Sequence, residues 1–204
     1  MQPKHIVNIN RYLTSLQRQR IEATPFKWML HLEQELDISI PLLRELISRW
    51  SVDDNCFRIR QHLVPFKVVD VCFALGLRVV GEELCLQVNK VFGGDDIKID
   101  ILLEKLGNKV YRKKNVDEIC RLYILLLLYV FFLLRTSRTF SSFPFKVLDI
   151  LDALDGYNWG GAVYDLIFFS LTRSSEVYNK QTNDREIYLA GYVPVLQVNG
   201  NYEK

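Results

Sequence analysis

Hydrophobic residues recur every three or four positions along most of the chain, which is the spacing of one face of an α-helix. The helices that this pattern predicts cover residues 10–22, 26–36, 41–50, 66–75, 95–106, 119–134, 146–154 and 159–174. Pro25 separates the first two, because the residue before a proline is disfavoured in helical conformation. Gly76 is expected to end the fourth, since glycine accepts the left-handed conformation at a helix C-terminus.

The most apolar stretch of the chain is 122–134, which reads LYILLLLYVFFLL and is closed by Arg121 and Arg135. As a helix it is about 20 Å long, too short for a hydrocarbon core of about 30 Å. We therefore expect a buried central helix at about 119–134 and no membrane contact. Asn115, followed three residues later by Glu118, resembles a capping box that starts this helix.

Only one segment has the alternation of a β-strand, and it predicts a small β-hairpin near residues 56–64. The expected fold class is therefore mainly α, a single compact multi-helix domain with one hairpin, over residues 1–178. Residues 179–204 are a C-terminal segment of uncertain state, in which 187–198 is apolar but divided by Pro194. A helix, an edge strand and a frayed tail all remain open for 187–198, and we expect it to mediate self-association.

Composition and charge narrow the classes of protein. The chain of 204 residues is 49% hydrophobic and 25% charged, as in globular domains, and its net charge is only +2. Such a balance gives no global attraction to nucleic acid or to an anionic membrane. The four cysteines form no Cys-x-x-Cys pair, and the N-terminus lacks the apolar core of a secretory signal. These features favour an intracellular protein, nuclear or cytoplasmic, without a metal site or cofactor.

The sequence contains few residues that are candidates for a catalytic or binding site. Cys56 and His62 are close enough in sequence for a hairpin to bring them together, but an exposed histidine and a packed cysteine are the favoured interpretation. One basic stretch is a candidate for contact with nucleic acid, through Lys105, Lys109, Arg112, Lys113 and Lys114. No catalytic residue is predicted. Gly160 and Gly161, early in the last helix, lower helix propensity by roughly 1 kcal/mol each relative to alanine, so we expect them to allow close backbone packing.

Four stretches, taken in order, resemble one plant family. They are 15–26, from Ser-Leu-Gln-Arg to Pro-Phe; 41–50, Pro-Leu-Leu-Arg-Glu-Leu to Trp; 68–81, Val-Val-Asp-Val to Leu-Gly-Leu and Gly; and 157–164, Tyr-Asn-Trp-Gly-Gly-Ala-Val-Tyr. The family is the aminotransferase-like plant mobile domain, or the related plant domain that accompanies ubiquitin-like-protein-specific cysteine proteases in transposable elements. The family motif residues, to which the resemblance gives a structural role, are Asp70, Gly76, Trp159, Gly160, Gly161 and Tyr164.

The resemblance implies a transposon-derived protein with a nuclear role, no aminotransferase activity and no catalytic residues to carry over. Members of that family usually continue with further helices beyond the equivalent of Ser175, so the segment 179–204 is expected to be truncated or diverged. The resulting hypothesis is a non-catalytic domain that binds protein partners, whose identity the sequence does not give. A nucleic-acid-binding module using residues 105–114 and an enzyme with an unrecognised site are the alternatives.

Overall fold

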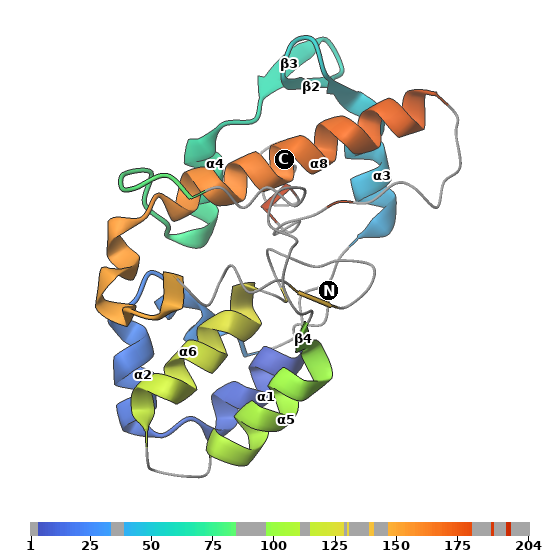
Figure 1. The fold of residues 1–204 in the computed structure, drawn as a ribbon. Helices are drawn as coiled ribbons and strands as arrows, with labels where there is room; N and C mark the ends of the chain where they lie inside the picture. The colour runs from blue at the N-terminus through green and yellow to red at the C-terminus, as the bar shows by residue number, and fades with distance from the viewer. Residues whose placement is uncertain are drawn as a thin grey trace.

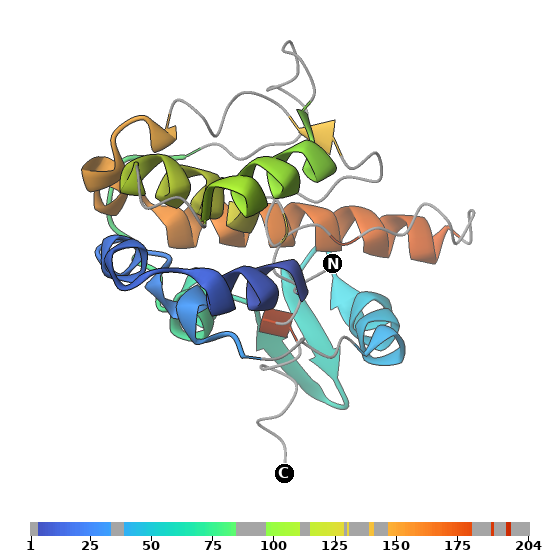
Figure 2. The same ribbon diagram turned by 90° about the horizontal axis from the view of Figure 1, so that it is seen from below.

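Two groups of elements share one hydrophobic core (Figure 1). The first group is helical and consists of α1 (Lys4–Tyr12), α2 (Ser15–Glu22), α5 (Ile99–Val110) and α6 (Val116–Leu127). The second group consists of α3 (Ile40–Arg49), three short strands, α4 (Val68–Leu75) and the long helix α8 (Trp159–Asn179). Helices α3 and α4 and the first of the strands pack along α8. Figure 2 shows α8 crossing the molecule between α5 and α6 on one side and α3 and the sheet on the other.

This computed structural model describes residues 4–33, 39–84, 97–110, 115–128, 130, 139–140, 147–180, 189 and 195–196. The element composition within these ranges is mainly helical, as the hydrophobic spacing predicts.

Helix α6 confirms the predicted buried central helix over the part that the structure describes. Its side chains from Tyr123 to Leu127 are all buried, as are Leu128 and Val130 beyond its end. The helix packs against both α2 and α5, which explains why more than one of its faces is apolar. Residues 129 and 131–134 of the predicted helix lie outside the described residues.

The predicted hairpin is also confirmed, with one addition. Strands β2 (Cys56–Ile59) and β3 (His62–Pro65) are antiparallel, with Ile59 opposite His62. A two-residue strand, β1 (Trp50–Ser51), pairs with β2 and makes a three-stranded sheet. A second small pair joins β4 (Ile97–Lys98) to β5 (Thr139–Phe140).

The predicted first helix, 10–22, is instead two helices, and its start was placed too late. Helix α1 begins at Lys4, and the chain breaks at Thr14 before α2. The Thr14 hydroxyl accepts a hydrogen bond from the Gln17 N–H at 3.3 Å, and the Gln17 side chain accepts one from the Thr14 N–H at 2.9 Å. This reciprocal capping box satisfies N–H groups that a new helix leaves unpaired, so it stabilises a second start.

Three other predicted helices differ in extent. The described part of 26–36 forms the short 3-10 helix η1 (Lys27–His31). In 146–154, residues 147–148 are helical, and η3 (Leu151–Gly156), also 3-10, follows after a break. Helix α5 continues through Gly107, where we expected it to end. The cap predicted for α6 is wrong in its detail, because Asn115 is left-handed (φ 77°) and its amide bonds the Glu118 carboxylate rather than the backbone.

A buried polar link ties α1, α6 and η1 together. The Tyr123 hydroxyl donates to Asn10 Oδ1 at 2.7 Å, and Asn10 Nδ2 donates to the carbonyls of Met29 at 2.9 Å and Leu32 at 3.3 Å. Burial raises the pKa of the Tyr123 hydroxyl, so it stays a neutral donor. Because both side chains are buried, losing either partner leaves an unpaired polar atom in the core.

Replacing Tyr123 with phenylalanine is therefore expected to destabilise the fold by about 1–3 kcal/mol, the usual cost of an unsatisfied buried acceptor. The measurement is urea unfolding followed by circular dichroism. Tyr178→Phe, at a more exposed tyrosine near the end of α8, is the matched control and should change the free energy of unfolding little. Equal effects in both variants would contradict the role of the link.

Candidate functional site

The first turn of α8 packs directly on α4 and the chain that follows it. The Gly160 N–H donates to the Arg78 carbonyl at 3.0 Å. A Cβ added at Gly160 would collide with the Cys72 Sγ and lie 2.7 Å from the Arg78 carbonyl oxygen. Only glycine allows this approach without a shift of the backbone. Burial raises the pKa of the Cys72 thiol, so this sulfur packs as a neutral group.

Gly161 has a different role. Its N–H donates to Asn158 Oδ1 at 2.8 Å, so Asn158 is the N-cap of α8. A Cβ at Gly161 would lie 2.6 Å from Asn158 Nδ2 and would push the cap away. Sequence reasoning treated the two glycines as one packing motif and missed this cap, although asparagine before a helix is a common capping signal.

Three distant segments meet around Trp159, which is buried. Its Nε1–H donates to the Leu154 carbonyl at 2.8 Å, and its ring contacts Phe26 edge-on with the ring centroids 4.8 Å apart. A short parallel bridge joins Glu82 to Tyr157 beside it. With the contacts of Gly160 to Cys72 and Arg78, this packing brings three of the four stretches that carry the family resemblance together in space: 15–26, 68–81 and 157–164.

The other motif residues hold α4 in place. The Asp70 carboxylate accepts the Lys67 N–H at 2.7 Å at the start of α4, and Gly76 (φ 63°) ends the helix in the left-handed conformation. The Tyr164 hydroxyl, on α8, donates to the Phe66 carbonyl at 3.2 Å just before α4. Asp70, Gly76 and Tyr164 therefore position the helix rather than present chemistry of their own.

Four apolar side chains on this helix and the chain after it are exposed, and we term these four residues the α4 surface. It consists of Val69, Phe73, Val79 and Val80, whose exposed fractions are 40%, 86%, 43% and 79%. Val69 and Phe73 are four residues apart, so they share one side of α4. Sequence reasoning missed this surface, because a helix that is apolar on several sides is usually buried on all of them.

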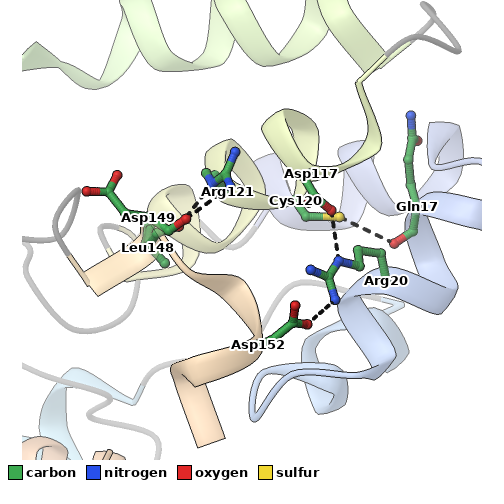
Figure 3. A network of polar contacts seen from close by, with 8 residues as sticks. All are labelled: Gln17, Arg20, Asp117, Cys120, Arg121, Leu148, Asp149 and Asp152. Carbon is green, nitrogen blue, oxygen red and sulfur yellow. Dashed lines mark hydrogen bonds and ion pairs between the residues drawn. The ribbon is translucent and has the colours of Figure 1, made fainter.

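An internal polar network holds the other end of η3 (Figure 3). Arg20 bonds Asp117 on α6 at 2.8 Å and Asp152 on η3 at 2.5 Å, while Arg121 donates to the carbonyls of Leu148 and Asp149, each at 3.0 Å. Hydrogen bonds to the two carboxylates raise the pKa of Arg20, and Arg20 in turn lowers the pKa of Asp152. The guanidinium groups of Arg20 and Arg121 thus bond to other parts of the chain, and their role is to hold η3 in position.

Other sequence candidates do not assemble into a site in the part that is described. Cys56 is opposite Pro65 and His62 is opposite Ile59, so these two residues lie at opposite ends of the hairpin and form no dyad. Lys105 is exposed on α5, the side chain of Lys109 is not described, and Arg112, Lys113 and Lys114 lie outside the described residues. Nucleic-acid binding through 105–114 therefore stays a prediction.

The segment predicted for self-association, 187–198, is described only in part. Val195 and Leu196 are buried members of the core, and Leu189 packs against it. These three side chains contact the interior, and the remainder of the segment lies outside the described residues.

Neither a metal site nor a membrane-spanning helix is found in the residue ranges that the structure describes. Within these ranges, no three histidine, cysteine, aspartate or glutamate side chains are grouped closely enough to hold a metal ion. Among the helices of the same ranges, none combines the length and the apolar character needed to cross a bilayer.

Comparison with known proteins places the chain in a family. The family described as a domain of unknown function, DUF8566, matches residues 1–197. The chain belongs to the DUF8566 family. No curated protein and no solved structure matches it. The match includes every element of the junction between α4 and α8, and the DUF8566 description carries no activity. The resemblance to the plant mobile domain stays a prediction.

The packing at the start of α8 gives a direct test. We expect Gly160→Ala to destabilise the DUF8566 fold by about 1–3 kcal/mol, the usual cost of overpacking. Gly107→Ala is the matched control, because a Cβ there meets nothing within 4 Å and alanine favours the helix, so a gain of about 0.5–1 kcal/mol is expected. Urea unfolding measures both. Similar effects of the two changes would show that Gly160 has no special packing role.

Proposed function

We propose that this DUF8566 chain is a non-catalytic protein-interaction domain that binds its partner through the α4 surface. The observation that carries the proposal is Phe73, a large apolar side chain left 86% exposed on a helix. Single exposed apolar residues are common, but a group of them marks a surface for another protein. Covering a phenylalanine side chain is worth roughly 1.5–3 kcal/mol.

The two parts of the α4 surface, one on α4 and one on the following chain, are both attached at the same residue of α8. Cys72 and Arg78 both lie against Gly160, and their chain neighbours Phe73 and Val79 are therefore held near the same point on α8. The surface thus combines part of a helix with part of the following chain, which a partner would contact together.

The α4 surface is also held rigid before any partner arrives. The Gly160–Arg78 and Tyr164–Phe66 hydrogen bonds fix α4 on α8 from both ends. A preformed surface loses less conformational entropy on binding than a flexible one, so more of the burial energy appears as affinity. Aromatic residues are also the common anchors of protein interfaces.

The resemblance to the plant mobile domain extends the proposal to the origin of the protein and its place in the cell. We propose a transposon-derived plant protein with a nuclear role. The convergence of three of the resembling stretches at the α4–α8 junction supports the view that they are parts of one structural unit.

The test compares Phe73→Ser with a matched change at Phe169, which is 52% exposed on α8. Tagged wild-type and variant chains capture partners from the source cells, and each candidate is then purified and titrated against all three chains. We expect Phe73→Ser to weaken the direct complex about 30-fold, the equivalent of about 2 kcal/mol at an anchor residue. Phe169→Ser should leave the affinity within twofold.

Both variants should fold as the wild type does, because the replaced side chains are largely exposed. Circular dichroism and thermal unfolding check this. A direct partner whose affinity is unchanged by Phe73→Ser would overturn the assignment of the α4 surface.

A further inference from the structure

A cavity of about 250 Å³ lies next to the α4 surface. Three segments build its wall: the end of α2 with Glu22, the chain after α4 with Gly76 and Arg78, and the end of η3 with Asp155 and Tyr157. Arg78 precedes Val79 in the chain, and Gly76 follows Phe73 by three residues. A partner that covers the α4 surface therefore reaches the mouth of the cavity.

The ends of these helices give the cavity an electrostatic preference. Helices α2 and α4 both end at its wall, at Ala23 and Gly76. The last carbonyls of an α-helix have no partner within the helix, and they give its C-terminus a charge of about −0.5. The N-terminus of α8, at Trp159, lies at the same wall and carries about +0.5. The three helix ends together therefore leave a small negative surplus, which favours a positively charged ligand.

The side chains at the wall do not reverse this preference. Glu22 and Asp155 bring two carboxylates, and Lys27 and Arg78 bring two cations. Within the described part of the chain, none of these four side chains is in an ion pair, so they are available to a ligand. Their formal charges cancel, so the two C-terminal helix ends and the N-terminus of α8 leave a surplus of about −0.5.

Size and shape narrow the class of ligand. Sites for cofactors and drug-sized molecules usually enclose about 300–1,000 Å³, so this cavity is suited to one long side chain. The half-buried ring of Tyr157 adds an aromatic face, which attracts cations and stacks well with a planar guanidinium. A guanidinium also has five N–H donors for carbonyl and carboxylate acceptors.

We infer that this cavity receives an arginine side chain of the protein that covers the α4 surface. The inference rests on the proposed protein-binding function and adds the chemistry of the partner: an apolar contact for Phe73 with an arginine beside it. Glu22, Asp155 and the carbonyls at the ends of α2 and α4 accept its hydrogen bonds, and Tyr157 lies against its plane.

The test uses the full chain and a small probe, N-acetylarginine methylamide, which carries the side chain without charged termini. Binding is followed by NMR through the backbone amides of Gly76 and Arg78 and the indole N–H of Trp159. We expect saturable shifts with a millimolar Kd. N-acetylcitrulline methylamide, nearly the same shape without the charge, should bind at least tenfold more weakly.

Variants of the wall separate charge from shape. Glu22→Gln combined with Asp155→Asn should weaken binding of the arginine probe about tenfold, and Arg78→Gln should strengthen it. Glu104→Gln, at an exposed carboxylate on α5, is the charge-matched control and should have no effect. All four replaced side chains are exposed, so the amide spectrum away from the cavity should stay unchanged.

Equal binding of the arginine and citrulline probes, or no saturable shift at these reporters, would overturn the inference. Tighter binding of N-acetylglutamate methylamide than of the arginine probe would show that the cavity prefers an anion, which contradicts the inference. If the arginine probe does not bind but the affinity of the partner depends on Phe73, only the assignment of the cavity is wrong. If the probe binds but the affinity of the partner does not depend on Phe73, the proposed docking surface is wrong instead.

Discussion

The close approach of the α8 backbone to the chain after α4 is the constraint on which the rest of the site depends. At Gly160 the absence of a Cβ allows a backbone hydrogen bond to Arg78 and contact with the Cys72 sulfur. This packing fixes the position of the C-terminal end of α4 against α8. It also brings Gly76 and Arg78 to the ends of α2 and η3, so the α4 surface and the cavity are both consequences of one helix contact.

Hydrophobic burial holds the two groups of elements together, and polar contacts decide their alignment. The apolar core runs from α1 through α6 to α8 without interruption. Ion pairs of Arg20 with partly exposed carboxylates add little free energy, because solvent screens them. Their effect is geometric, since Arg20 and Arg121 fix η3 against α2 and α6 and thereby place Tyr157 and Trp159. The buried Tyr123–Asn10 bond aligns α1 with α6 in the same way.

The proposed function follows from two neighbouring features with different chemistry. The α4 surface is apolar, whereas the cavity beside it is lined by two carboxylates and two cations. An apolar contact supplies most of the affinity of a protein complex, and a charged group beside it supplies selectivity. A rigid helical domain that presents both is suited to recognise a defined segment of another protein.

The sequence by itself determined the features that depend on local pattern and on overall burial. Periodicity located α3, α6 and α8, alternation located the β2–β3 hairpin, and the apolar run at 122–134 predicted the buried part of α6. The sequence also contains the signal for the break at Thr14, a threonine three residues before a glutamine. The helical spacing of apolar residues continues across this position, so the spacing alone predicts one helix. Only the tertiary structure decided which apolar side of α4 stays exposed and that Glu22, Arg78 and Asp155 share one wall. Helical spacing states which residues share a face, whereas exposure and convergence depend on which distant segment covers that face.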